Sequence, residues 1–276
     1  MKAPGSTRSR EVTLVCVLLL LLTPSRRLFA QPTPAAGSAF HAYAQEVESR
    51  LARQHQSGDT FLALTAPDPV NEATRLRNGA LVIEQLTPSA GAELSGALLH
   101  HWRGTAFVLG AKAVDFERLT QDFKTYPQHF SPQVLQAHKI AQDGDRMQAW
   151  MRVRQQHLVP VVLDTTYEIT YGRLDGQHGY SISRSTRIAE IYAAGTAAER
   201  ALNADEEHGF LWRLNTYWSY EEKDGGLYLQ IEAVSLTRSI PHGLGWVIRP
   251  YVESIPRDSL EFTLRSACNA LRKQTK

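Results

Sequence analysis

The C-terminal part of the chain contains two long alternating segments, a tight turn and one amphipathic helix. The alternating segments are 210–222 and 227–238, and Lys223-Asp224-Gly225-Gly226 lies between them. An Asp-Gly turn between two such segments predicts an antiparallel hairpin. The helix expected over 256–271 carries an apolar stripe made of Leu260, Leu264, Cys268 and Leu271. The hairpin and the helix each have one apolar face, and both faces are buried when the helix lies across the sheet.

The first 30 residues have the pattern of a secretory signal peptide. A basic start precedes the apolar run 12–22, which is too short to span a bilayer comfortably, and the small residue Ala30 precedes an expected cleavage site. Arg26 and Arg27 after the apolar run leave open an uncleaved membrane anchor as the alternative. We therefore expect an exported protein, periplasmic or secreted, that is cleaved near Ala30 or anchored by this segment.

Removing this segment reverses the sign of the net charge. Residues 1–30 hold five of the 30 Lys and Arg residues and one of the 28 Asp and Glu residues, so the rest of the chain has 25 and 27, a net charge of −2. A nucleic-acid partner is therefore not expected, because such partners bind basic surfaces. Cys268 is then the one cysteine left in the sequence, so we expect it to be a buried hydrophobe without a disulfide.

The periodicity of the remaining chain predicts one α+β domain over 80–276, preceded by a helical and loop extension over 31–79. Helices are expected over 39–56 and 112–126 in addition to the C-terminal one. Further strands are expected over 80–86, 99–110, 134–141, 146–154, 161–171 and 179–191. A long antiparallel meander curls, and a helix on its concave side closes it. Such an arrangement leaves an elongated cavity between sheet and helix that suits an apolar ligand.

Several short segments of the chain carry a resemblance to a known superfamily. They are Val114-Asp115-Phe116, Tyr126-Pro127, Phe130-Ser131-Pro132, the hairpin 224–228, the segment 235–241 and the segment 255–260. With the order of the elements, they resemble the START/polyketide cyclase (SRPBCC) superfamily, and most of all its coenzyme Q-binding and polyketide cyclase/dehydrase branch. The end of the chain is similar to an exported bacterial subgroup.

The resemblance covers about 99–271 and has a limited set of implications. It implies the helix-grip fold, in which a curved antiparallel sheet wraps around a long C-terminal helix, and a cavity for a hydrophobic ligand. It does not imply a reaction, because one fold can host carriers, cyclases and sensors.

The two faces of the expected strand 210–222 offer different ligand contacts. Trp212 and Trp218 share one face, where they would form an aromatic wall. Arg213 and Tyr217 share the other face, which is polar. That polar face would either orient a ligand headgroup inside the cavity or lie on a solvated convex surface.

Four further residues are candidates for ligand contacts near the C-terminal helix. Arg238 would anchor an anionic ligand group or form a salt bridge that fixes the crossover to the helix. Trp246 would line the cavity entrance, make a transient membrane contact, or pack in the core. Leu260 and Leu264 would cover the cavity from the helix side.

No catalytic or metal-binding constellation is recognisable in the sequence. His100 and His101 are neighbours on an expected strand and so point to opposite faces, and Gly-x-Ser-x-Gly does not occur. We therefore expect no metal and no cofactor, and favour non-catalytic binding or transport of a hydrophobic small molecule or lipid. The alternatives are a cyclase/dehydratase-type enzyme that uses polar cavity residues, and an interaction protein whose own side chains fill the cavity.

Overall fold

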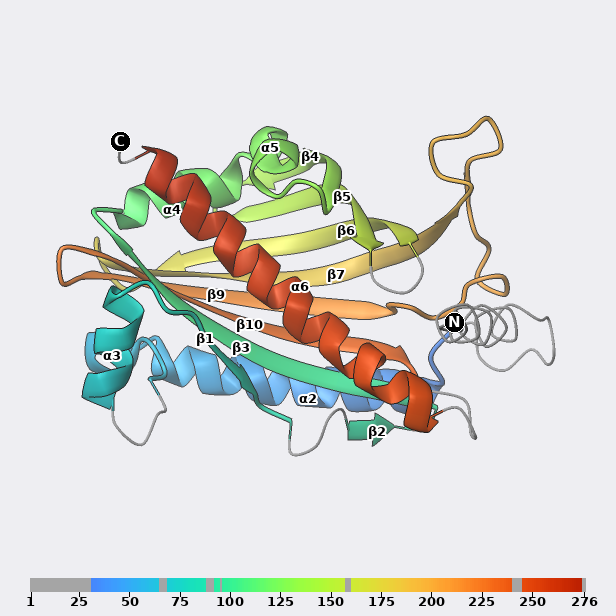
Figure 1. Ribbon diagram of the computed structural model, residues 1–276, viewed down its shortest axis with the longest axis horizontal. Helices are drawn as coiled ribbons and strands as arrows, with labels where there is room; N and C mark the ends of the chain where they lie inside the picture. Colours follow the sequence, from blue (N-terminus) through green and yellow to red (C-terminus); the bar gives the residue numbers. More distant parts are fainter. Residues whose placement is uncertain are drawn as a thin grey trace, which may run out of the picture.

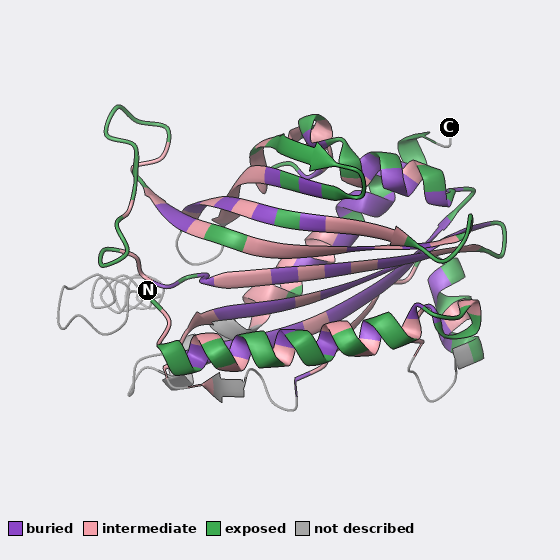
Figure 2. Ribbon diagram, turned by 180° about the vertical axis from the view of Figure 1, so that it is seen from behind, coloured by how far each residue is buried: buried purple, intermediate pink, exposed green. Residues whose placement is uncertain are grey.

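The computed structural model describes residues 31–64, 69–87, 92–94, 96–156, 160–239 and 245–274. Its centre is a ten-stranded antiparallel sheet whose main path runs β1-β3-β10-β9-β7-β6-β5-β4. The long helix α6 (Gly245–Gln274) crosses one face of this sheet, as Figure 1 shows. Figure 2 shows helix α2 (Pro34–Gln54) lying along the opposite face. The predicted α+β class, with a curved antiparallel sheet around a C-terminal helix, is confirmed.

Eight strands follow the predicted order, with ends that differ by a few residues, and the short strands β2 and β8 lie in segments that were predicted to be loops. They are β1 (Val82–Gln85), β2 (Ala92–Leu94), β3 (Ala97–Leu109), β4 (Val134–Asp143), β5 (Arg146–Gln156), β6 (Pro160–Arg173), β7 (His178–Tyr192), β8 (Arg200–Ala201), β9 (Arg213–Lys223) and β10 (Gly226–Arg238). The predicted hairpin joins β9 to β10. Asp224 and Gly225 at its turn both have positive φ, 56° and 73°, as a two-residue hairpin turn of the primed type requires.

The helix predicted over 112–126 is divided into shorter pieces. These are α4 (Ala113–Gln121), the 3₁₀ turn η2 (Phe123–Thr125) and α5 (Tyr126–His129). Helix α4 ends at Gln121, before Asp122, whose φ of −92° and ψ of 75° are not helical. Pro127, expected to end this helix, instead lies in the first turn of α5, where its missing N–H is not needed. The other helical segments are η1 (Gly58–Thr60) and α3 (Pro69–Arg77).

The prediction that Pro256 begins the last helix was wrong. Helix α6 begins at Gly245, so Pro256 lies inside it. A proline inside a helix removes one backbone hydrogen bond, which is why the sequence favours a boundary there. Contacts of α6 with β3 and β10 override this local preference.

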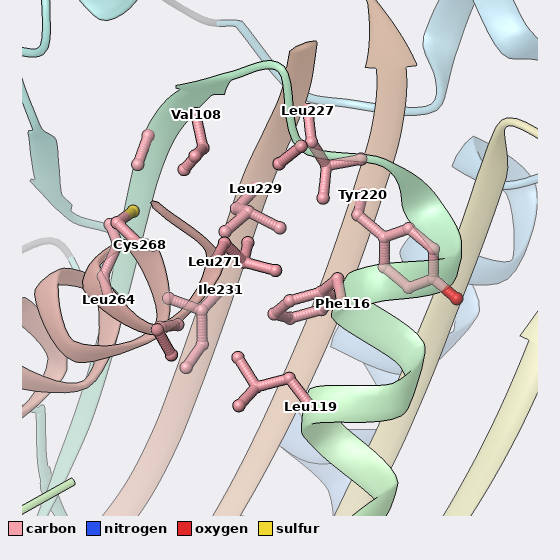
Figure 3. Packing of buried hydrophobic residues seen from close by; sticks show 14 of the residues in the cluster. Val108, Phe116, Leu119, Tyr220, Leu227, Leu229, Ile231, Leu264, Cys268 and Leu271 are labelled. Carbon is pink, nitrogen blue, oxygen red and sulfur yellow. The ribbon is translucent and has the colours of Figure 1, made fainter. Parts of the chain in front are cut away.

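One hydrophobic core lies between the concave face of the sheet and α6 (Figure 3). Leu264 and Leu271 are completely buried in it. Gly104 on β3 allows the helix to approach closely, since a Cβ atom there would lie 2.5 Å from Leu260 Cδ2. Burial raises the pKa of the Cys268 thiol to about 11, so this cysteine packs as an unreactive hydrophobe, as predicted.

A second core lies on the convex face, beneath α2. Phe40, Val47 and Leu51 of this helix are buried against residues of β3, β9 and β10, among them Leu99 and Leu236. The sequence left open whether the N-terminal helix packs on the domain or trails away from it. In the structure it packs on the domain and covers the back of the sheet.

A buried ionic network joins α2 to the convex face. Glu232 on β10 is 1% exposed, forms an ion pair with Arg50 and accepts a hydrogen bond from His101 Nε2 at 2.9 Å. Tyr43 hydroxyl lies 2.9 Å from Nδ1 of the same imidazole. Burial alone would raise the pKa of Glu232, but the hydrogen bonds and charges of His101 and Arg50 outweigh burial and lower it. The carboxylate is therefore ionised. Its Oε2 binds Arg50 and so holds α2, whereas its buried Oε1 has no hydrogen-bond partner among the described residues and lies 3.7 Å from Arg103 Nη1.

Two substitutions on α6 test which side of this helix faces the sheet. Leu264→Ala should lower the free energy of unfolding by about 2–5 kcal/mol, because it leaves a cavity in a close-packed core. Glu261→Ala removes a partly exposed side chain that pairs with Arg265, and it should cost roughly 0.5 kcal/mol or less. Urea denaturation of both variants measures these values, and equal losses would contradict the assignment of the buried stripe.

The end of α2 should make stability depend on pH. His55 is buried, its Nε2 lies 2.8 Å from Ser219 Oγ, and burial lowers its pKa to about 4. The unfolded chain binds a proton near pH 6.5 and the folded chain does not, so stability is lost as pH falls from about 6.5 to about 4. The loss due to His55 should reach up to about 3 kcal/mol.

Urea denaturation across that pH range measures the effect. His55→Phe keeps a ring beside Tyr180, whose ring centroid lies 4.4 Å from that of His55, but cannot take up a proton. This variant should be less stable at neutral pH, because Ser219 loses its partner, and should show a flatter pH dependence. An unchanged slope would exclude His55 as a source of the pH dependence.

Candidate functional site

An apolar cavity of about 250 Å³ lies between the concave face of the sheet and α6. Strands β5, β6, β7, β9 and β10 form its floor, α4 and α5 close one end, and α6 covers it. Helix α6 packs on β3 and β10, at one side of the sheet. The cavity therefore extends from beneath the helix toward β7, β6 and β5. The predicted cavity between sheet and helix is present and is not filled by the side chains of the described residues.

Aromatic side chains form the end of the cavity next to α4 and α5. The ring of Phe116 lies edge-on to Trp218 at 5.0 Å between centroids, and Phe123 stacks on Tyr126 at 4.4 Å. Such contacts fix the positions of the rings and leave a rigid apolar wall.

The tyrosines of this wall are protonated hydrogen-bond donors. Tyr126 and Tyr171 both donate to the carbonyl oxygen of Thr120, at 2.9 and 3.0 Å. Burial raises the pKa of Tyr167 to about 12 and raises the pKa of Tyr126 as well. These hydroxyls therefore hold the wall together and do not act as general bases at neutral pH.

Hydroxyl side chains interrupt the apolar lining along the floor of the cavity. They belong to Thr165 on β6, Ser181 and Ser183 on β7, Thr216 on β9, and Ser235 and Thr237 on β10. Among the described residues that line the cavity, Arg154 is the one charged residue, and none is a carboxylate. The described lining is thus apolar with neutral polar atoms on one side.

Two of the residues predicted to contact a ligand line the cavity. Trp218 lies in its floor and Leu260 covers it from α6. Leu264, one turn further along the helix, is packed in the core beside the cavity and lies against Ile83 and Gly104 on the β1–β3 side. Trp246 is part of α6, but its side chain lies outside the described residues.

Four of the predicted residues, Trp212, Arg213, Tyr217 and Arg238, lie away from the cavity. Trp212 was expected beside Trp218 in one aromatic wall, but β9 begins at Arg213, so the strand alternation does not extend to Trp212. Its backbone N–H donates to Leu236 at 2.8 Å, and its side chain packs in the convex core under α2. Arg213 also lies outside the cavity lining and donates to the carbonyl of Trp212 at 2.7 Å.

Tyr217 is buried on the convex face, where it donates to Glu48 of α2 at 3.2 Å. This face lies on the convex side, as the second interpretation expected, but α2 covers it at Tyr217, so it is not solvated there. The sequence interpretation failed since it did not place α2 over this side of the sheet.

Arg238 lies at the end of β10 and contacts a neighbouring loop. Its Nη1 lies 3.5 Å from the carbonyl oxygen of His208, and its backbone N–H donates to Gly209 at 2.9 Å. It does not line the cavity, so a role as the anion anchor of this site is not supported.

Most residues that line the cavity were missed by the sequence interpretation. Those from α4 to β7 include Phe116, Phe123, Tyr167, Ser181 and Ser183. A signal was available for the strands, because positions 165, 167 and 169 and positions 181 and 183 alternate on one face of each strand. Which of the two faces is concave depends on long-range packing that the alternation does not reveal.

A second hollow of about 430 Å³ lies beside the first, at the ends of β6 and β9. Its lining is polar and includes the carboxylate of Glu117 on α4. Glu117 accepts a hydrogen bond from Tyr220 at 2.7 Å and pairs with Arg173, so its carboxylate is already engaged. Tyr171 lines both hollows and separates this polar one from the apolar cavity.

The sheet, the crossing helix and the cavity between them complete the arrangement that the sequence predicts. The chain has the helix-grip fold. Within the described helices none is long and apolar enough to cross a membrane. Among the described residues, no three His, Cys, Asp or Glu side chains form a group that could hold a metal ion.

Several solved structures are similar to this helix-grip chain. Three are a STAR-related lipid transfer protein from Xanthomonas axonopodis, the Zhui aromatase/cyclase from Streptomyces sp. R1128, and human STARD10. Their sequence identities are 17%, 12% and 8%, with TM-scores of 0.42, 0.46 and 0.42. The similarity covers 70%, 64% and 76% of this chain and 98%, 96% and 81% of theirs. No family model and no curated protein matches the chain.

Proposed function

We propose that this protein binds a hydrophobic small molecule or a lipid in the cavity between the sheet and α6, and that it catalyses no reaction on it. The observation that carries the proposal is the apolar cavity of about 250 Å³ beneath α6. An engineered dry cavity of about 150 Å³ is sufficient to bind benzene. A fused-ring compound or part of an acyl chain would therefore fit here.

Binding would be driven by removing apolar ligand surface from water. Each Å² of apolar surface removed from water contributes about 25 cal/mol. The aromatic end of the cavity, with Phe116 and Trp218, offers rigid surfaces that need no ordering when a ligand enters. The site thus favours apolar ligands with a planar or extended shape.

The lining supports binding more strongly than it supports catalysis. A cyclase or dehydratase reaction moves protons and needs a group poised to accept one inside the cavity. The described lining residues include no carboxylate and no histidine, and the tyrosines of the wall are protonated at neutral pH. The enzyme therefore remains the weaker alternative.

We also propose that the protein works outside the cytoplasm, after cleavage near Ala30. The support is the sequence of residues 1–30, which lie outside the described part of the structure. N-terminal sequencing of the protein from a periplasmic or secreted fraction should find Gln31 at or near the first position. Recovery of a chain that starts at Met1 from membranes would favour the anchored alternative.

Tryptophan fluorescence can test the proposed ligand site. A panel of a fused-ring hydrocarbon, a quinone and a long-chain alcohol should contain members that change the emission and raise the melting temperature. Trp218→Phe should remove most of the change in emission, since Trp218 lines the cavity. Trp212→Phe is the matched control, and it should retain the change because Trp212 lies in the core under α2.

Two outcomes would count against the proposal. If no member of the panel changes the emission or the melting temperature at saturating concentration, the protein does not bind apolar ligands in this cavity. If Trp212→Phe loses the response and Trp218→Phe keeps it, the ligand binds on the convex side of the sheet.

A further inference from the structure

A row of hydroxyl side chains crosses three strands of the cavity floor. In the sheet register Ser183 on β7 lies opposite Thr216 on β9, and Thr216 lies opposite Ala233 on β10. Ser235 follows two residues after Ala233 on the same face, so it lies diagonal to Thr216. All three hydroxyl residues line the cavity. They form a continuous row, here called the hydroxyl band.

The hydroxyl band continues beneath α6 to a buried histidine. His100 on β3 lies opposite Ser235, and its Nε2 lies 3.3 Å from the Thr237 hydroxyl, which also lines the cavity. His100 is 1% exposed, and its Nδ1 has no hydrogen-bond partner among the described residues. A buried polar atom without a partner is costly, and few native structures contain many of them.

A second unpartnered atom lies on the helix above. Ser259 of α6 lines the cavity, and its hydroxyl is buried without a hydrogen-bond partner among the described residues. A serine inside a helix can donate to the carbonyl four residues earlier. The Ser259 hydroxyl does not make this bond, so it is available to a ligand as donor or acceptor. Of the two unpartnered atoms, the Ser259 hydroxyl thus belongs to a residue that lines the cavity, whereas His100 lies on β3 next to the band and does not line the cavity.

The groups around the hydroxyl band are neutral. Burial lowers the pKa of His100 to about 4, so its imidazole is uncharged at neutral pH and has one donor and one acceptor nitrogen. Arg154, the one charged residue among the described lining, belongs to β5. Three strand spacings, roughly 14 Å along the sheet, separate β5 from β9, where Thr216 lies. A carboxylate at the band would therefore be buried without a cation.

We infer that the ligand is amphipathic but uncharged, with a hydroxyl or carbonyl oxygen held at the hydroxyl band and an apolar frame against Phe116 and Trp218. This inference rests on the proposed function and adds the chemical class and the orientation of the ligand. Hydroxyl side chains both donate and accept, so the band suits an alcohol or a ketone equally. It disfavours a pure hydrocarbon, which leaves the band unpaired, and a fatty acid, which is charged.

Four compounds with one fused-ring frame test the inference by calorimetry at neutral pH. They are naphthalene, 2-naphthol, the methyl ketone 2-acetylnaphthalene, and 2-naphthoate. The naphthol or the ketone should bind about fivefold more tightly than naphthalene, the gain expected from one net hydrogen bond. Naphthoate should bind most weakly. The difference between naphthol and ketone shows whether the band acts mainly as acceptor or as donor.

Two variants test whether the hydroxyl band causes the preference for oxygenated compounds. Ser235→Ala and Thr216→Val remove one hydroxyl each, and they should reduce the affinity for the preferred oxygenated compound by about fivefold while that for naphthalene stays within about twofold. Thr170→Val is the matched control, since Thr170 belongs to β6 but does not line the cavity. It should change neither affinity.

The outcomes separate this inference from the function on which it rests. If naphthalene binds as tightly as both oxygenated compounds, or if naphthoate binds best, the inference is wrong and the binding function stands. If the two variants lose affinity for naphthalene and for its oxygenated relatives equally, the band affects only the shape of the cavity, and the inference is also wrong. If none of the four compounds binds, the proposed function fails and the inference fails with it. The comparison of the four compounds uses the unmodified protein, so it holds even where a variant does not fold.

Discussion

The close contact between α6 and β3 at Gly104 determines the rest of the architecture. With no side chain at this position, Leu260 and Leu264 of the helix lie directly against the strand. The helix is thereby anchored to β3 and β10, at one side of a sheet that curves. The strands beyond β9 continue the curve, and the space between them and the helix is the cavity. A larger residue at Gly104 would force the side chains of α6 to move, and the roof of the cavity with them.

Strand β10 connects this contact to the back of the molecule. Leu229 and Ile231 face α6, while Glu232 and Val234 belong to the side covered by α2. The strand is buried on both faces, and its polar residues on the convex face have partners within the protein, except for Oε1 of Glu232, which has no hydrogen bond among the described residues. Glu232 pairs with α2, and Gln230 bonds to the Ala63 backbone at 2.8 Å and to Thr105 at 3.0 Å. Helix α2 thus stiffens the floor on which a ligand would lie, without contributing to the lining.

Local patterns in the sequence predicted most of the long strands and the last helix, whereas short elements and some helix ends depended on tertiary packing. The Asp224-Gly225 turn and the spacing of Leu260, Leu264, Cys268 and Leu271 predicted the hairpin and the buried side of the last helix correctly. Pro256 misplaced the start of that helix, because helix α6 tolerates a proline that local propensity disfavours.

The candidate site was predicted in outline and only partly in residues. The cavity between sheet and helix followed from the order of the elements, and Trp218 and Leu260 line it. Tyr217 was assigned to it because alternation identifies two faces of a strand without showing which is concave. Trp212 was assigned to it because the alternation was extended beyond the start of β9 at Arg213. The cover that α2 provides over Tyr217 comes from contacts distant in sequence, such as the one between Tyr217 and Glu48. The hydroxyl band was missed for the same reason, since it appears only when three strands are aligned.

The central claim is that a ligand enters the space under α6 and leaves the core under α2 unchanged. The most direct test is a methyl NMR titration of the protein with naphthalene. We predict that the resonances of Ile231 and Leu260, which line the cavity, shift in a saturable way. Those of Val47 and Leu236, buried under α2, should stay in place. Shifts confined to Val47 and Leu236, or no saturable shift at any of the four residues, would contradict the claim.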